Sequence, residues 1–402
     1  MENESIENKS TEEETVVDNK EEITEKTSEN NNENNNVNNN ESKKKGFFSR
    51  MSTPKKIILI IVVVLLLAVA AAGVTLLVIR GKGEASLRDM SGTLIDSMAM
   101  EESKQVYYDG KEYKYNDKLI NILLIGNDSQ KTVAQLGEAN EQGAGLADTL
   151  FLVTIDPEKK SVDCISINRH TMAKIDLVVP GFGVINNYET QVTRQYSYGT
   201  GLEDSCELTV KAVSGIFGNI PIHGYASLSL NAIKPLNHVV GGVEVEVLEA
   251  IPGEEHNEIM NRNYGIGDSL LNAVGKTITL TDDQAYAYLR HRGQYVGDSD
   301  KRLDRQRQYL KALFKKIIDN TKKDITFPMK VRDALSDWLV TDIDDNEMIY
   351  LVSSLIFYKL NIDSVAHLPG TVSQGEDTAE QFYPDEDGMK KIVIERFYKP
   401  AD

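Results

Sequence analysis

The chain has 402 residues and a formal net charge of −18, from 62 acidic and 44 basic side chains. This length allows one large domain, or two ordinary domains with tails. An acidic chain without a helix-turn-helix or zinc-ligand pattern is poorly suited to binding nucleic acid, so we expect no nucleic-acid partner.

The first 56 residues have the composition of a tail. Residues 1–42 hold 13 acidic and 3 basic side chains and almost no large apolar ones. Such a segment cannot bury enough surface to offset its chain entropy, so we expect it to be disordered. Six basic residues follow between Lys43 and Lys56. We interpret residues 1–56 as an acidic cytosolic tail that ends in a basic cluster beside the membrane.

Residues Ile57–Ile79 form an apolar run of 23 residues without a charged side chain. At about 1.5 Å per residue, a helix of this length crosses the roughly 30 Å hydrocarbon layer. The larger basic cluster precedes the run, so the positive-inside rule places the N-terminus in the cytosol and the remainder outside the cell. The alternative is a buried core helix. The sequence predicts a single-pass protein of the cell membrane, with a transmembrane helix at 57–79 and an extracellular stem at 80–117 that contains a short amphipathic helix, Leu87–Met100.

From Lys118 the pattern becomes that of an α/β domain. Apolar runs ended by turn residues predict strands, and longer periodic stretches predict helices. The expected strands are Leu119–Ile125, Thr149–Ile155, Ser161–Ile167, Val243–Val247 and Ser364–Leu368. The expected helices are Cys206–Phe217, Ala232–Val240, Asn346–Tyr358 and Met389–Tyr398. Strands that alternate with helices indicate a sheet covered by helices.

The two cysteines, Cys164 and Cys206, allow two interpretations. Outside the cell an oxidised pair is possible. Cys164 falls in an apolar strand, however, and small buried thiols are common there. Two sulfurs exclude a cysteine-based metal site, and the six histidines show no ligand spacing such as His-x-x-x-His.

The stretch 281–318 holds a group of cationic side chains between two predicted helices. Thr281 and Gln284 fit a capping box that starts the first helix, and Arg290 and Arg292 fall where it should end. The second helix should begin near Arg302, and it places the side chains three and four positions later on the same face.

Arginine offers a planar set of donors that matches phosphate oxygens in pairs. One hypothesis for this stretch is therefore a diphosphate site, and the other is a solvated helix with Asp–Arg pairs.

Three more charged residues gather if the first three strands form an antiparallel meander. Asp128 follows the first strand, Asp148 precedes the second and Arg169 follows the third, so all three lie at one edge of the sheet. Paired carboxylates with open positions suit Mg²⁺, which fills its other positions with water and phosphate. The alternatives are turn or cap residues for the aspartates and a surface ion pair for the arginine.

Seven short motifs occur in order between residues 118 and 400. They are Gly-x-Asp (126–128), Ala-Asp-Thr (147–149), Ser-Ile-Asn-Arg-His-Thr (166–171), Pro-Gly-Phe-Gly-x-Ile-Asn (180–186), Val-Gly-Gly-Val-Glu-Val (240–245), Arg-His-Arg (290–292) and Asp-x-Arg-x-x-Arg-Gln (300–306). Each is weak alone, but their order and rough spacing together resemble the LytR-CpsA-Psr family. The resemblance implies an α/β catalytic domain over 118–402, with a central mixed β-sheet flanked by α-helices.

Members of that family resemble phosphotransferases of the Gram-positive wall. The resemblance implies transfer of an anionic glycopolymer, such as teichoic acid or a capsule-like polymer, from an undecaprenyl-diphosphate carrier to peptidoglycan. The prenyl chain would lie in an apolar tunnel between sheet and helices. The partners would be the polyprenyl-diphosphate-linked glycopolymer, peptidoglycan and the membrane.

Matching motif positions implies a role for each site residue. Asp128 and Asp148 match metal-binding aspartates for Mg²⁺. The catalytic set would be Asp128, Asp148, Arg169 and Arg302. The diphosphate-binding set would be Arg169, Arg290, Arg292, Arg302, Arg305 and Gln306.

The sequence departs from the family pattern at three places. Leu146 stands where an arginine is usual, His170 where an aspartate is usual, and Val184 where a lysine is usual. These substitutions remove charged side chains from the predicted site, and we expect them to affect the catalytic rate more than ligand binding. They keep a second hypothesis open, a membrane-anchored receptor that binds prenyl-diphosphate glycans without turnover. Histidine is the side chain that ordinarily changes charge near neutral pH, so His170 is a candidate general base, with a satisfied surface histidine as the alternative.

Overall fold

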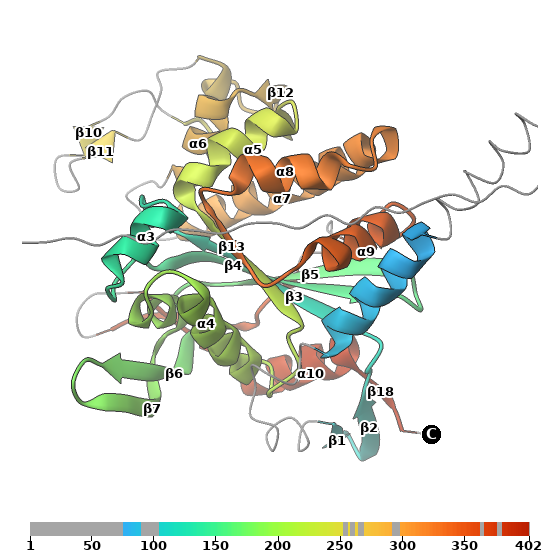
Figure 1. Cartoon of the computed structure of the whole chain (residues 1–402). Helices are drawn as coiled ribbons and strands as arrows, with labels where there is room; N and C mark the ends of the chain where they lie inside the picture. The colour runs from blue at the N-terminus through green and yellow to red at the C-terminus, as the bar shows by residue number, and fades with distance from the viewer. Residues whose placement is uncertain are drawn as a thin grey trace, which may run out of the picture. The chain divides into compact units, whose positions relative to one another are not determined.

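A mixed β-sheet lies at the centre of the fold (Figure 1). Within the described residues it has seven strands in the order β13–β8–β3–β4–β5–β14, and β15 also pairs with β5. Strands β3, β4 and β5 form the predicted antiparallel meander, whereas β8 runs parallel to β3. The bounds are β3 Ile120–Asn127, β4 Ala147–Asp156, β5 Ser161–Ile167, β8 Gly224–Ser229, β13 Leu339–Thr341, β14 Lys359–Leu360 and β15 Ala366–His367.

The computed structural model describes residues 75–89, 104–251, 256–257, 262–263, 269–291, 298–361, 366–375 and 380–401. They all belong to one unit, Leu67–Asp402. The predicted acidic tail, the basic cluster, most of the predicted transmembrane segment and Arg292 lie outside the described residues. Among the helices that are described, none is both long and apolar enough to cross a bilayer.

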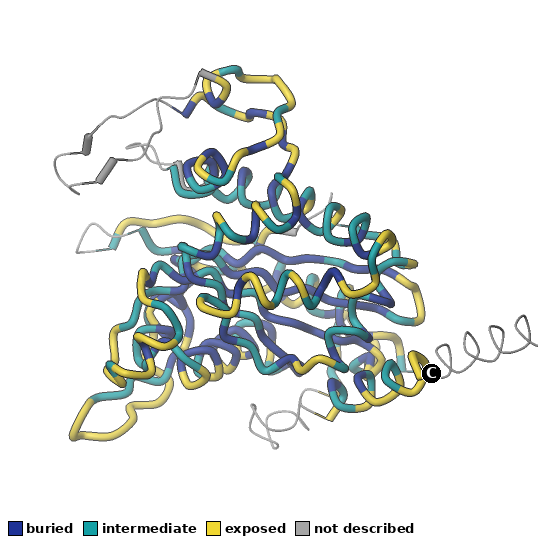
Figure 2. The backbone as a smooth tube through the Cα atoms, turned by 45° about the horizontal axis from the view of Figure 1, so that its top comes forward, coloured by how far each residue is buried: buried dark blue, intermediate teal, exposed yellow. Residues whose placement is uncertain are grey.

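Helices cover both faces of the sheet (Figure 1). Successive residues of a strand point to opposite faces, and accordingly Leu123 and Ile125 join one buried cluster while Ile120 and Ile122 join another. The strands are therefore apolar on both faces and form the dark interior in Figure 2. The helices are α3 Val133–Ala139, α4 Glu203–Ile216, α5 Ile233–Val239, α6 Asp282–Arg290, α7 Asp298–Lys323, α8 Phe327–Leu335, α9 Asp345–Leu355 and α10 Glu386–Phe397.

Several predicted helices are confirmed with shifted ends. Helix α4 begins at Glu203 rather than Cys206, and α7 begins at Asp298 rather than near Arg302. The capping box at Thr281 is present, because its hydroxyl accepts from the Gln284 N–H and the Gln284 side chain accepts from Thr281. Of the predicted helix Leu87–Met100, residues 90–100 lie outside the described part.

The cysteines are both buried and free. Cys164 belongs to the cluster on one face of the sheet and Cys206 to the cluster on the other, so the sheet separates them. Burial raises the pKa of the Cys164 thiol to about 12, which leaves it protonated and inert. The structure therefore favours the buried-thiol interpretation.

Part of the predicted stem is folded into the domain. Strands β1 (Gln105–Tyr108) and β2 (Lys111–Tyr115) form a hairpin, and β2 pairs with β18 (Tyr398–Pro400) near the C-terminus. Residues 75–89 are helical, and a Cβ added at Gly83 would lie 2.3 Å from the Asn346 carbonyl oxygen on α9. This close approach requires glycine.

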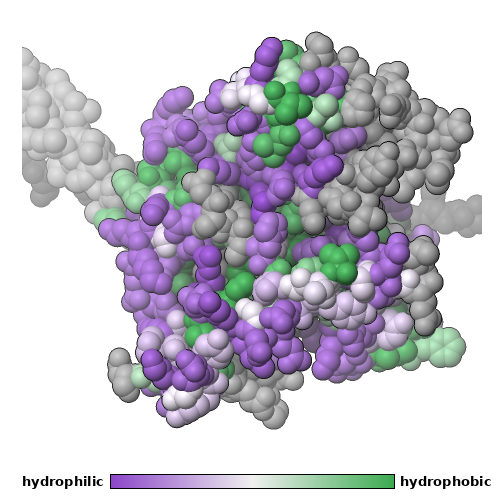
Figure 3. All heavy atoms as spheres, turned by 180° about the vertical axis from the view of Figure 1, so that it is seen from behind, coloured by the Kyte–Doolittle hydropathy of each residue, from purple (hydrophilic) through white to green (hydrophobic). Residues whose placement is uncertain are grey.

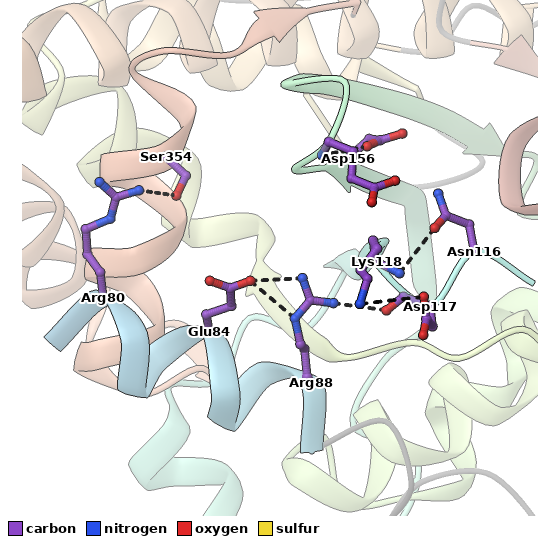
Figure 4. A network of polar contacts seen from close by, with 9 residues as sticks. Arg80, Glu84, Arg88, Asn116, Asp117, Lys118, Asp156 and Ser354 are labelled. Carbon is purple, nitrogen blue, oxygen red and sulfur yellow. Dashed lines mark hydrogen bonds and ion pairs between the residues drawn. The ribbon is translucent and has the colours of Figure 1, made fainter. Parts of the chain in front are cut away.

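Polar contacts hold helix 75–89 in place (Figure 4). Arg80 donates to the Ser354 hydroxyl at 3.1 Å on α9. Arg88 donates to the Asp117 carbonyl at 2.9 Å and pairs with Glu84 at 3.0 Å. Together with the fully buried Leu87, these contacts make the helix part of the domain surface.

Smaller sheets surround the core. Strands β6 (Met172–Val179) and β7 (Gly183–Gln191) form a hairpin beside α4 (Figure 1), and most of β7 is exposed (Figure 2). The other pairs are β9 Val243–Glu246 with β12 Thr277–Leu280, β10 His256–Asn257 with β11 Arg262–Asn263, and β16 Gly370–Gln374 with β17 Glu380–Pro384. On the face in Figure 3 hydrophilic residues dominate and hydrophobic ones form small separate groups.

Candidate active site

Asp148 lies between two arginines from distant parts of the chain. It stands at the start of β4, and its Oδ1 accepts a hydrogen bond from Nη1 of Arg169, which follows β5. Its Oδ2 lies 4.0 Å from Nη1 of Arg302 on α7. The antiparallel meander places Arg169 there, and the packing of α7 against the sheet adds Arg302. The predicted meeting of Asp148 and Arg169 is thus observed, and Arg302, which the family resemblance assigns to the same set, lies beside them.

Arg169 also has a donor that no group in the described part of the chain uses. Its Nε is buried and has no hydrogen-bond partner among the described residues. A buried N–H without an acceptor costs free energy, so its presence beside a cavity points to an anionic ligand that would accept from it. A small hollow lies directly against it, lined by Asp148, Arg169, Arg302 and Gln306 among others.

Asp128 is held by the loop that connects β3 and β4. Its Oδ1 accepts from the Leu146 N–H at 2.7 Å, and its own N–H donates to the Leu146 carbonyl at 3.2 Å. Gly145 has φ of +128°, and a Cβ there would lie 2.8 Å from the same Oδ1. Only glycine fits this backbone, so Gly145 lets the loop orient the Asp128 carboxylate.

The two aspartates line one cavity of about 190 Å³ between the sheet and the helices α5, α6 and α7. Most of its polar residues lie at or beside the ends of β3, β4, β8 and α6 and in the first turns of α7, and most of its apolar residues lie farther along these elements and on α5. The polar set includes Asn127, Asp128, Asp148, Thr149, Ser229, Arg290, Arg302 and Gln306. The apolar set includes Leu124, Phe151, Ala226, Leu228, Ile233, Leu236, Leu289, Leu310 and Leu313.

Helix α7 supplies both parts of the cavity. Arg302, Gln306 and Leu310 follow one another at spacings of four residues, so they form a single stripe along the helix. The stripe changes from cationic to amide to apolar over about 12 Å. A ligand with a charged head and a hydrocarbon tail would match this sequence of side chains.

Helix α6 adds the remaining cation. Arg290 is its last residue and lines the cavity. Gln306 Nε2 donates to the carbonyl of the neighbouring Leu289 at 3.4 Å, which ties the end of α6 to α7. Arg292 lies outside the described residues, so its predicted role stays a prediction.

Arg305 occupies a different place from the one that the motif implies. It is 1% exposed, does not line either hollow, and donates to Glu249 and to the carbonyls of Tyr288 and His291. Burial lowers its pKa to about 10, so it stays charged at neutral pH. Each of its three guanidinium nitrogens donates to a protein acceptor, so in this structure it supports the end of α6 and does not face the cavity.

Ser229 is a cavity residue that sequence analysis missed. Its hydroxyl is buried and has no partner in the described part of the chain. It ends strand β8, which the apolar pattern did not reveal, and it pairs in register with Asn127 at the end of β3. Because the two strands are parallel, their carboxyl ends meet at the edge that carries Asp128.

Comparison with known proteins identifies the family. The LytR_cpsA_psr family model matches residues 89–395. The chain belongs to the LytR-CpsA-Psr family. It is 26% identical over 298 residues to the polyisoprenyl-teichoic acid–peptidoglycan teichoic acid transferase TagU of Enterococcus faecalis, across 73% of this chain and 84% of TagU.

Two further proteins illustrate the similarity. TagV of Bacillus subtilis, which carries the same transferase name, is 26% identical over 277 residues, or 68% of this chain and 63% of TagV. A Streptococcus agalactiae protein of known crystal structure superposes with a TM-score of 0.55 at 20% identity, across 71% of this chain and 90% of that protein. The mixed α/β fold is thus that of the LytR-CpsA-Psr family.

Two of the positions that depart from the LytR-CpsA-Psr pattern differ in their relation to the cavity: Leu146 contacts a cavity residue, and His170 does not line the cavity. Leu146 uses its backbone to hold Asp128, which any side chain permits. His170 is 9% exposed and lies 3.4 Å from Glu380 and 3.2 Å from the Gln191 amide, and it does not line the cavity. The alternative that placed His170 at the protein surface is therefore wrong. The carboxylate beside His170 belongs to Glu380 of β17.

Mg²⁺ is the cation that the family resemblance implies for Asp128 and Asp148. Both carboxylates line the same cavity. Among the described residues, no group of three or more His, Cys, Asp or Glu side chains could hold a metal ion. Two carboxylates beside an arginine-lined hollow fit Mg²⁺, which takes few protein oxygens and completes its shell with phosphate and water.

Proposed function

We propose that this chain transfers a glycopolymer from an undecaprenyl-diphosphate carrier to peptidoglycan. The observation that carries the proposal is the single cavity that joins arginines and carboxylates to an apolar interior. A prenyl diphosphate has the same two parts. The transferase names of the family members TagU and TagV support the same reaction.

The proposed reaction exchanges the phosphoanhydride bond of the diphosphate for a phosphate ester. An acceptor hydroxyl oxygen attacks the phosphorus that bears the glycan, a new P–O bond forms, and the P–O bond to the prenyl phosphate breaks. The hydroxyl proton passes to solvent water, and the electron pair of the broken bond leaves with the prenyl phosphate. Positioning and charge stabilisation account for most catalysis in such transfers.

Arg302 and Arg169 would bind the diphosphate oxygens and stabilise the charge on the leaving prenyl phosphate. In the structure Asp148 holds both guanidiniums in place, which orients them before the ligand arrives. Arg290 and Gln306 would contact the other side of the diphosphate. Mg²⁺, when bound by Asp128 and Asp148, would supply further neutralisation of the diphosphate charge.

The location of the protein is part of the proposal. The apolar run Ile57–Ile79 would anchor the chain in the cell membrane with its N-terminus in the cytosol, and the folded domain would lie outside the cell. The carrier and the wall acceptor both occur on that side. Protease protection of the tail, but not of the domain, in intact cells would test this topology.

Transfer is best tested with the purified full chain in liposomes that contain a glycan-linked undecaprenyl diphosphate. With Mg²⁺ and peptidoglycan chains present, we expect release of undecaprenyl phosphate and covalent glycan on peptidoglycan. Chelation of Mg²⁺ should slow both. Release of neither product, with the lipid still bound, would instead support the receptor hypothesis, which the losses at Leu146 and His170 favour.

A further inference from the structure

A second groove lies between the β6–β7 hairpin and α4. Figure 1 shows the hairpin beside this helix. It holds about 540 Å³, and none of the described residues that line it belongs to the first cavity. Its walls come from both hairpin strands, from α4 and from the short turn after it. The polar lining residues are Lys174, Asp176, Asn187, Glu189, Gln195, Lys211 and Asn219.

The groove has a fixed shape because its walls are joined. Strand β6 has a bulge at Asp176, and the Gln195 side chain accepts from the Asp176 N–H at 2.7 Å and donates to its carbonyl at 3.0 Å. The Asp176 carboxylate binds Lys211 of α4 at 2.6 Å. These contacts hold the hairpin against the helix at a defined distance.

The charges of the groove balance. Lys211 pairs with Asp176, and Lys174 lies directly opposite Glu189 in the hairpin register. Three side-chain amides supply donors and acceptors without net charge. The groove has no excess of positive charge that would bind a polyanion. A neutral or zwitterionic ligand rich in hydroxyl and amide groups can form hydrogen bonds with its lysines, carboxylates and amides.

The groove also lies close to the reacting centre along the chain. Met172, at the start of β6, lines it, and Arg169 stands three residues earlier. Three residues span at most roughly 10 Å, and here the chain turns, because the Thr171 N–H donates to the Asn168 carbonyl at 2.9 Å. A polymer seated in the groove would therefore reach past Arg169 toward the phosphorus, from a direction that the prenyl cavity does not use.

We infer that this groove binds the acceptor, the N-acetylated glycan strand of peptidoglycan with its zwitterionic peptides. The inference rests on the proposed function, since it names the site of that reaction's second substrate. It separates the two polymers by charge: the anionic donor is held at the arginine-lined mouth, and the acceptor in the balanced groove.

A blocking substitution tests the groove. Gly215 lies on α4, and a Cβ there would meet only the Asn219 side chain, at 4.0 Å. Gly215→Tyr should therefore fold normally and fill the groove. The matched control is Gly137→Tyr on α3, an exposed helix position where a Cβ meets nothing within 4 Å.

A second variant removes one polar contact without changing the backbone. Asn187 has φ of +59°, a conformation that glycine adopts freely. Asn187→Gly should keep the hairpin and weaken binding through loss of the amide. This effect should be smaller than that of Gly215→Tyr.

The experiment measures binding of soluble, uncross-linked peptidoglycan chains to the full-length protein in detergent, without any donor lipid. We expect saturable binding by the wild type and by Gly137→Tyr, and affinity reduced at least about tenfold in Gly215→Tyr. No binding by the wild type, or equal binding by Gly215→Tyr, would overturn the inference. Because no transfer is measured, failure of the proposed reaction would show separately in the liposome assay.

Discussion

Arg302 on α7 and Asp148 on β4 face each other across the polar end of the cavity, with Nη1 and Oδ2 4.0 Å apart. Asp148 also accepts a hydrogen bond from Arg169, so one carboxylate orients two cations. An arginine held in this way needs little reorganisation when a diphosphate replaces the carboxylate as its partner. This arrangement defines the most direct test of the site.

Arg302→Ala should reduce transfer strongly. Loss of one preorganised charge donor costs about 2–4 kcal/mol of transition-state stabilisation, or roughly 30-fold to 1,000-fold in turnover. The measurement is release of undecaprenyl phosphate by the purified protein in liposomes. Arg302→Lys keeps the charge but not the planar pair of donors, and it should recover only part of the rate. Unchanged transfer by Arg302→Ala would exclude this residue from the catalytic set.

Arg305→Met should lower the free energy of unfolding and leave diphosphate binding unchanged. It would leave Glu249 and the carbonyls of Tyr288 and His291 without their donor. Loss of one partner from a buried ionic group costs about 3–5 kcal/mol of unfolding free energy. Urea denaturation should show this loss, and Lys315→Met at an exposed position of α7 should not. A stable Arg305→Met protein that binds the lipid poorly would return Arg305 to the diphosphate-binding set.

Gly145→Ala should displace the Asp128 carboxylate. The new Cβ would meet Oδ1 at 2.8 Å, at a backbone φ of +128°. We expect a lower rate of transfer and a higher Mg²⁺ concentration for half-maximal rate. Gly143→Ala is the control, because Gly143 has φ of +85° but nothing within 4 Å of its Cβ position. Equal loss in both variants would mean that backbone strain alone is responsible.

Ala226→Phe should shorten the apolar part of the cavity. Ala226 lines it from β8, and a phenyl ring would occupy space proposed for the prenyl chain. The KM for a full-length undecaprenyl substrate should rise by about tenfold or more, while a short-chain prenyl diphosphate is less affected. If both substrates respond equally, the hydrocarbon chain lies elsewhere.

Asp342→Asn should stabilise the protein at neutral pH. Desolvation, with a smaller contribution from Glu347, raises the pKa of Asp342 to about 6. Between the unfolded pKa near 4 and pH 6 the native state binds the extra proton, so stability falls as pH rises through this window.

Asparagine keeps the acceptor for the Tyr225 N–H, which lies 2.7 Å from Oδ1, and removes the charge. We expect a gain of about 1–2 kcal/mol at pH 7, after allowance for partial exposure, and almost none at pH 4. Urea denaturation at the two pH values measures it. A gain of equal size at both would show that ionisation is not its cause.

The early strands show how far sequence patterns reach. Alternating and continuous apolar runs predicted β3, β4 and β5, and antiparallel pairing then required Asp148 and Arg169 to meet. The start of α6 followed from the local hydrogen bonds of Thr281 and Gln284. Such features depend on neighbouring residues or on one short connection, so the chain encodes them locally.

The structure was needed where partners are distant in the sequence. The predicted stem contributes β2 to a sheet with β18. A local sequence pattern cannot predict that strands from the two ends of a domain pair with each other. Strand β8 was missed for the same reason, and Ser229 with it. Its place beside β3 depends on packing that periodicity does not record.

By itself the sequence determined strands β3, β4 and β5, the start of α6, the order of the family motifs and the convergence of Asp148 with Arg169, because propensity, capping and antiparallel connection act over short separations. Only the tertiary structure decided which arginine of α7 lines the cavity. Arg302 and Arg305 are three residues apart on one helix face, yet Arg302 lines the cavity and Arg305 is buried among Glu249 and the carbonyls at the end of α6. The neighbours that separate these roles come from other segments, and their positions follow from how the helices pack on the sheet.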